Sequence, residues 1–256
     1  MVEMLMKRMA LLASGGIPPE PADNGYALLS TVTAATTWTC PKNGWYRITC
    51  VGKGGNGGDG GNSGSTNNIQ NTGGGGGGSG GSAGCCSSVY FIKKGEKIAF
   101  SFSTRSITAN ATLESASVSM NAKNGTDGSD GTGAKNTGGS LFTAGEGGAA
   151  GSGGSASGGN KINKSGSGND GSDGIKATRT DENSKWNKTS WGSGGSAKTA
   201  SFPSGFTGDK SYGEGGRGGK GGGVGGGLTH SAFGDNAKGD SGRNGGAAAA
   251  FIEQAA

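Results

Sequence analysis

The sequence has few of the residues that build an ordinary hydrophobic core. Only 30% of its 256 residues are hydrophobic and 6% are aromatic, and no apolar run has the length of about 18 residues that a membrane-spanning helix needs. Glycine supplies 61 residues, and ordering glycine costs more backbone entropy than ordering any other residue. A folded state must therefore depend on dense main-chain hydrogen bonding.

Residues typical of catalytic and metal sites are also scarce. The single histidine, His230, excludes a cluster of histidine ligands, and no nucleophile motif accompanies it. The four cysteines include no Cys-x-x-Cys pair for zinc, so reduced thiols are favoured, with a Cys40–Cys50 disulfide left open. The net charge of +5 comes from scattered residues rather than a basic block. We therefore expect no enzyme, no cofactor and no bound nucleic acid.

The glycines that replace the usual core residues recur at intervals of three. Polyproline-II geometry has this period but no internal hydrogen bonds, so such glycine segments need partners outside themselves. Collagen is excluded because the five prolines lie outside the glycine runs. We expect a packed bundle of polyglycine-II helices, with a flexible, disordered glycine-rich chain as the alternative. The triplet runs lie at 54–61, 125–131, 145–154, 168–174, 213–227 and 239–245.

Segments with strand character precede and follow the glycine runs. Asn43-Gly44 lies between two β-rich runs in 37–52 and predicts a hairpin, with Tyr46, Ile48 and Cys50 on one strand face. We expect a mainly β fold, in which an antiparallel β-framework, a small sandwich, carries long glycine excursions. The other expected strands are a second hairpin in 88–102, a weaker strand in 112–120 and a last strand in 247–254.

The first 36 residues differ from the rest of the chain. Leu5, Met9 and Leu12 belong to an apolar stripe with helical spacing, which predicts a docking helix followed by a linker. Packing of this helix on its own domain and a short signal peptide are the alternatives. We divide the chain into this N-terminal region, 1–36, and a glycine-rich β/polyglycine-II domain, 37–256.

Aromatic and polar residues gather in one part of the glycine-rich domain. Loops that carry such side chains are typical of sugar- or protein-binding tips, because aromatic faces supply contact area and polar groups supply orientation. The alternative is that these side chains cover glycine rods, which cannot cover themselves. The candidate receptor contacts are Trp186, Asn187, Lys188, Trp191, Phe202, Phe206 and Tyr212.

Two copies of Asp-Gly-Ser-Asp-Gly are weak calcium candidates. They place Asp127 and Asp130, and again Asp170 and Asp173, three residues apart on one edge of a three-residue helix. The motif is shorter than an EF-hand loop and lacks the spacing of calcium β-rolls. A solvated turn is the favoured interpretation, so we assign no metal.

Three stretches in this order carry a resemblance to a known family. They read Tyr-Arg-Ile-Thr-Cys-Val-Gly-x-Gly-Gly from Tyr46, Lys-Lys-Gly-Glu-Lys from Lys93 and Gly-Gly-Ala-Ala-Ala-Ala-Phe-Ile-Glu from Gly245. Over about 37–256 the chain resembles the glycine-rich domain of bacteriophage tail-fibre and tail-tip proteins. The resemblance implies a virion structural protein, often at the fibre end, whose loops touch the host surface and which is commonly a homotrimer.

These expectations lead to one function and two alternatives. The first is a non-enzymatic phage tail-fibre or tail-tip protein, a rigid scaffold that presents loops for host attachment. Its partners would be other virion proteins and a bacterial surface glycan or outer-surface protein, and it would reside in the extracellular virion after assembly in the host cytoplasm, without membrane insertion. The alternatives are a capsid decoration or tail-assembly subunit without receptor binding, and a disordered glycine-rich matrix or RNA-associated protein.

Overall fold

The described chain is mainly β and contains two five-stranded antiparallel sheets. The computed structural model describes residues 17–65, 71–136, 142–163, 192–221 and 238–256. The first sheet has the order β1 (Tyr26–Val32), β14 (Ala249–Ala255), β3 (Gly44–Val51), β6 (Cys85–Ile92) and β13 (Ile162–Asn163). The second has the order β12 (Ala156–Ser157), β9 (Ser117–Lys123), β8 (Ser106–Thr112), β7 (Lys97–Phe102) and β2 (Thr36–Thr39).

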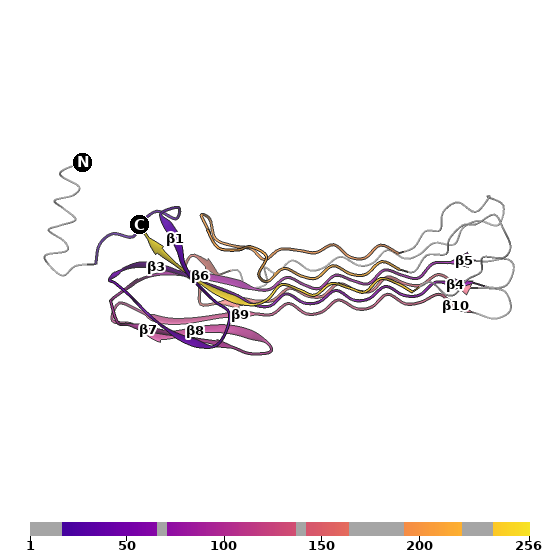
Figure 1. The fold of residues 1–256 in the computed structure, drawn as a ribbon, viewed down its shortest axis with the longest axis horizontal. Helices are drawn as coiled ribbons and strands as arrows, with labels where there is room; N and C mark the ends of the chain where they lie inside the picture. The colour runs from indigo at the N-terminus through magenta and orange to yellow at the C-terminus, as the bar shows by residue number, and fades with distance from the viewer. Residues whose placement is uncertain (1–16, 66–70, 137–141, 164–191, 222–237) are drawn as a thin grey trace.

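The two sheets pack face to face as a small sandwich at one end of the molecule (Figure 1). Alternate residues of β3 face the core between the sheets, and Tyr46, Ile48 and Cys50 lie together on this face, as the sequence predicts. Ile98 and Phe100 of β7 enter the same core from the second sheet. In β7 the alternation of apolar and small residues therefore identifies the buried face correctly, whereas β3 is buried on both faces.

Neither predicted hairpin forms. β3 pairs with β14 and β6, so neither of its edges is free for β2, which pairs with β7 in the other sheet. The prediction from Asn43-Gly44 is therefore wrong, and residues 40–43 instead carry the chain between sheets. The predicted hairpin of 88–102 is wrong for the same reason, because β6 is occupied by β3 and β13 while β7 pairs with β8.

The two crossover connections bind each other. The N–H of Cys40 donates to the carbonyl of Glu96 at 2.8 Å, and the N–H of Gly95 donates to the carbonyl of Cys40 at 2.9 Å. Gly95 has a φ of 88°, which glycine adopts without strain. Residues 112–120, predicted as one strand, contain the last residue of β8, the turn 113–116 and the first residues of β9, which pairs with β8 as a hairpin. The expected last strand is confirmed as β14.

A buried ion pair lies on the outer face of the first sheet. Nε of Arg47 donates to Oε2 of Glu253 at 2.7 Å, and both side chains are at most 2% exposed. Arg47 also donates to the carbonyls of Ser204 and Gly205, while Glu253 accepts from the N–H and the hydroxyl of Thr207. The pair thus fastens residues 204–207 to the sheet. Its hydrogen bonds offset the cost of removing two charges from water.

The four cysteines are free and buried. Cys50 and Cys86 stand opposite each other on β3 and β6, inside the sandwich. A hydrogen bond between their thiols and complete burial hold the pKa of Cys50 well above its usual value. The expected reduced thiols are thus present, and the Cys40–Cys50 disulfide that the sequence left open is absent.

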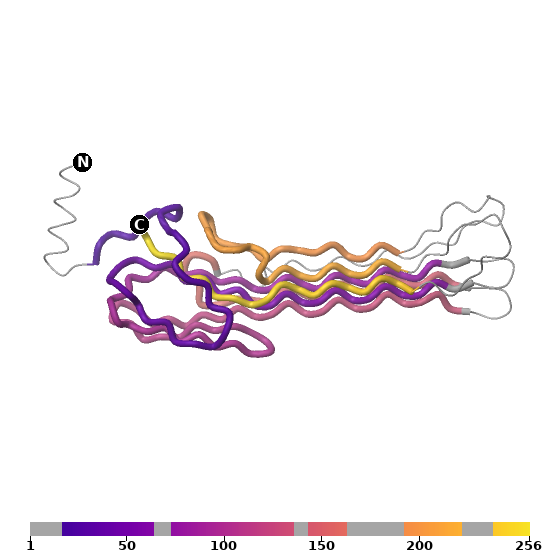
Figure 2. The backbone as a smooth tube through the Cα atoms, in the orientation of Figure 1, coloured from indigo at the N-terminus to yellow at the C-terminus, as the bar shows by residue number. Residues whose placement is uncertain are grey.

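Glycine segments extend side by side from the sandwich (Figure 2). They contain no helix or strand and are linked laterally by main-chain hydrogen bonds. We name them rod 1 (52–63), rod 2 (73–84), rod 3 (124–134), rod 4 (144–155), rod 5 (192–200), rod 6 (213–221) and rod 7 (238–247).

The hydrogen bonds between rods recur every third residue. In rod 1, the N–H groups of Gly55 and Gly58 donate to rod 2, whereas those of Gly54 and Gly57 donate to rod 7. Adjacent amides therefore bind different neighbours, so each rod is bonded in more than one direction. A strand, by contrast, bonds its neighbours within one sheet.

Rod 2 lies at the centre of the described rods. Its N–H groups donate to rods 3 and 6, and its carbonyls accept hydrogen bonds from rods 1, 4 and 5. Every residue of rod 2 is buried. Because other rods surround it, rod 2 has room only for small side chains, and its sequence contains only glycine, serine and alanine.

Candidate functional site: the distal end of the glycine bundle

The rods place several chain segments at the end of the bundle opposite the sandwich, which we call the distal end (Figure 1). Two short strand pairs lie there, β4 (Gly64–Ser65) with β5 (Asn71–Thr72) and β10 (Lys135–Asn136) with β11 (Phe142–Thr143). Gly221 and Gly192 are hydrogen-bonded to each other at the same end, and Gly192 also donates to Gly74. The described residues next to 66–70, 137–141 and 222–237 are thus all distal.

Four of the predicted contact residues come shortly before the distal residue Gly192 in the sequence. Trp186, Asn187, Lys188 and Trp191 lie outside the described residues, so their prediction stays untested. The next described residue, Gly192, is distal and donates its N–H to the carbonyl of Gly74 at 3.0 Å. Gly192 directly follows Trp191 in the sequence.

The other three predicted contacts lie at the sandwich end and pack inward. The rings of Phe206 and Tyr212 meet that of Phe251 edge to face, with centroids 5.0 and 5.5 Å apart, and Phe202 stacks on Phe206. Phe251 belongs to the outer face of the first sheet, so these side chains cover that face. They therefore cover a sheet face, whereas the alternative drawn from the sequence was that they cover glycine rods. Rod 5 runs from their end of the bundle to Gly192.

Asp127 and Asp130 use their carboxylates to bind the neighbouring rod. Oδ1 of Asp127 accepts from the N–H of Asn56 at 2.6 Å, and Oδ1 of Asp130 accepts from the N–H of Asp59 at 2.8 Å. Within the described part of the chain no group of three acidic, histidine or cysteine side chains could hold a metal ion. Asp170 and Asp173 lie outside that part.

Sequence reasoning missed the ladder to which these carboxylates belong. Side-chain oxygens of rod 3 accept from main-chain N–H groups of rod 1, and those of rod 1 accept from rod 7 in the same way. The signal was visible as Asn or Asp at every third position of two runs. The acceptors are Asn124, Asp127 and Asp130 in rod 3 and Asn56, Asp59 and Asn62 in rod 1.

The N-terminal docking prediction also falls outside the described residues, because Leu5, Met9 and Leu12 precede residue 17. No helix that could span a membrane occurs in the ranges that the structure covers. The large hydrophobic side chains exposed nearby are Ile17, Leu28 and Leu29.

Comparison of the chain with protein families, with curated proteins and with solved structures gives no match.

Proposed function

We propose that the chain is a non-enzymatic structural protein of a bacteriophage virion, of the tail-fibre or tail-tip type. Its glycine rods would form a stiff bundle that holds distal loops towards a bacterial surface glycan or protein. The sandwich end would face the other virion proteins. The protein would act outside the cell as part of the assembled particle.

We further propose that the rods are polyglycine-II helices. The three-residue recurrence of the inter-rod hydrogen bonds supports this geometry, because a helix with three residues per turn returns each amide to the same neighbour after three residues. At a rise of about 3.1 Å per residue, a rod of the length of rod 1 spans roughly 37 Å. That length separates the distal end from the sandwich.

The observation that carries the attachment role is the collection of several chain segments at one end. The described residues that flank 66–70, 137–141 and 222–237 all lie there, together with Gly192. Loops held by a rigid scaffold are the usual carriers of binding residues. The bundle adds reach, because it keeps these loops away from the sandwich.

A subunit of the capsid or tail without receptor binding is the second candidate. It is favoured by Phe202, Phe206 and Tyr212, since these three candidate contacts are used inside the protein. Imaging of the parent particle separates the two functions. A distal tip position supports attachment, whereas packing against capsid or tail tube supports the second candidate. The ordered inter-rod hydrogen bonds argue against the third alternative, a disordered glycine-rich matrix or RNA-associated chain.

Alanine substitution of the tryptophans tests the attachment role. The double variant Trp186→Ala/Trp191→Ala should fold normally and reduce adsorption of the particle to its host at least about tenfold, since buried aromatic contacts dominate binding energy. Adsorption kinetics of particles that carry the variant measure this loss.

A pair of lysine variants provides the control for that test. Lys188→Ala should weaken adsorption, whereas Lys97→Ala, on an exposed position of β7, should not. Equal thermal unfolding temperatures would show that the variants fold alike. Normal adsorption by the double tryptophan variant would remove the receptor role.

A further inference from the structure

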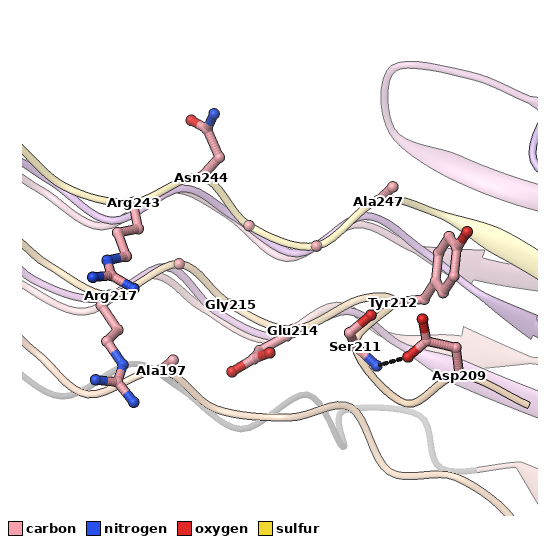
Figure 3. A pocket seen from close by; sticks show the side chains of 13 residues that line it. Ala197, Asp209, Ser211, Tyr212, Glu214, Gly215, Arg217, Arg243, Asn244 and Ala247 are labelled. Atoms are coloured by element: carbon pink, nitrogen blue, oxygen red, sulfur yellow. Dashed lines mark hydrogen bonds between the residues drawn. The ribbon is translucent and has the colours of Figure 1, made fainter.

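A polar cavity lies where rods 6 and 7 meet the sandwich, far from the distal end. Its volume is about 570 Å³, within the range of small-molecule sites. Rods 5, 6 and 7 and the turn at 209–212 surround it (Figure 3). Its charged, amide and aromatic lining residues are Asp209, Tyr212, Glu214, Arg217, Arg243 and Asn244.

Two arginines form the cationic end of the cavity. The N–H of Arg243 donates to the carbonyl of Arg217 at 2.8 Å, so the two residues are direct neighbours on adjacent rods. Figure 3 shows both side chains at the same end of the cavity. Across the described ranges, no carboxylate forms an ion pair with either guanidinium. Like charges side by side repel each other, even on exposed positions such as these, and an oxyanion between them would relieve this repulsion.

The register of rods 6 and 7 confines this positive charge to one level. One triplet towards the distal end, the N–H of Asp240 donates to the carbonyl of Lys220, so opposite charges are neighbours. One triplet towards the sandwich, the N–H of Gly246 donates to the carbonyl of Glu214, which leaves a single negative charge. A polyanion would need a continuous cationic track. The charge pattern instead fits one small anionic group.

The opposite end of the cavity carries groups that accept hydrogen bonds. Oδ1 of Asp209 accepts from the N–H of Ser211 at 2.9 Å, and hydrogen bonds to Ser211 lower the pKa of Asp209. Figure 3 places Glu214 between this end and the arginines. The ring of Tyr212 lies at the carboxylate end of the cavity and is held there by its edge-to-face contact with Phe251. Carboxylates that accept from hydroxyl groups, next to an aromatic ring, are suited to a sugar.

We propose that this cavity binds an acidic monosaccharide. Its anionic group, a carboxylate or a phosphate, would lie between Arg217 and Arg243, and its hydroxyl groups would donate to Glu214 and Asp209. The site would be separate from the distal loops and would not depend on the proposed attachment role. The protein would then bind an acidic sugar beside the sandwich, whatever the distal end contacts.

Titration of the full chain with three sugars tests the proposal. Glucuronate carries a carboxylate, glucose 6-phosphate carries a phosphate, and glucose carries neither. We expect calorimetry to detect binding of glucuronate, of glucose 6-phosphate or of both, and the pattern identifies which anion the site prefers. Glucose should bind at least about tenfold more weakly, because each charge-assisted hydrogen bond contributes about that factor. Binding of neither anionic sugar, or equal binding of glucose, would overturn the proposal.

Single variants locate the site. Arg217→Ala and Arg243→Ala should each weaken binding of the anionic sugar about tenfold or more. Arg217→Lys should also weaken it, because lysine keeps the charge but loses the planar fork. Lys220→Ala is the matched control: it removes one positive charge from the same rod outside the cavity and should leave the affinity unchanged. An equal loss in Lys220→Ala would show non-specific attraction and contradict the site.

Two further readouts separate this proposal from other effects. The three substituted side chains, Arg217, Lys220 and Arg243, are on exposed positions, so thermal unfolding should be unchanged in the variants. Normal host adsorption by Arg217→Ala particles, combined with lost sugar binding, would show that the cavity and the distal loops act independently.

Discussion

Gly78 lies in the buried centre of the bundle, where the absence of a side chain is required by a neighbouring main chain. A Cβ atom at this position would overlap the carbonyl oxygen of Ala149 in rod 4. Relief would require rod 4 to move, and rod 4 is held by hydrogen bonds to rods 2 and 3. Glycine is thus required at position 78 because the backbones of rods 2 and 4 approach each other closely there.

We therefore predict that Gly78→Ala destabilises the protein by at least about 3 kcal/mol, the upper range for overpacking of a rigid core. Gly133→Ala is the matched control, because a Cβ at Gly133 would be no closer than 3.4 Å to the nearest atom. It should change stability by less than about 1 kcal/mol. Chemical denaturation measures both, and equal effects would contradict tight packing at Gly78.

At the scale of elements, the rods on the outside of the bundle are joined by side chains as well as by main chain. Asn124, Asp127 and Asp130 of rod 3 each accept a hydrogen bond from an N–H group of rod 1. These bonds satisfy amides whose position in the triplet offers no carbonyl of a neighbouring rod. The ladder therefore adds a second contact between rods 1 and 3.

Asp130→Ala removes one step of this ladder and should lower the free energy of unfolding by about 1 kcal/mol, the usual net contribution of a hydrogen bond. Asp130→Asn should have little effect, because the amide oxygen remains an acceptor. Urea unfolding of both variants, with and without calcium, measures the difference. A large loss in Asp130→Asn, or a calcium-dependent shift in the wild-type protein, would indicate that the carboxylate charge serves a metal instead.

At the scale of the whole molecule, the bundle replaces a side-chain core by shared hydrogen bonds. Rod 2 is bonded to five other rods, and its amides can exchange only when these contacts open together. Amide exchange of glycine should therefore be slowest in rod 2.

Exchange in 73–84 should be at least about 10³-fold slower than in the unfolded chain, in line with the equilibrium constants of folded domains. Hydrogen exchange followed by mass spectrometry measures this, with the chain in denaturant as the control. Rapid exchange throughout 73–84 would contradict both the bundle and the polyglycine-II geometry proposed for it.

Prediction from sequence succeeded where a local pattern carried the information. The alternation in 97–102 identified the buried face of β7, and the apolar residues of 247–254 identified β14. Strand partners were predicted wrongly, because a turn such as Asn43-Gly44 is a local signal whereas an occupied strand edge is a property of the assembled sheet. The aromatic segment was likewise treated as one site, although Phe202 and Phe206 are used to cover Phe251.

By itself the sequence determined which positions can approach another backbone, since the triplet spacing of glycine leaves those positions without side chains. Only the tertiary structure decided which rods are neighbours, that rod 2 is central and that Arg217 lies beside Arg243. The physical reason is that one glycine carbonyl is the same acceptor as any other. The choice among them depends on where each rod joins the sandwich, and the strand pairings that set these positions are distant in sequence.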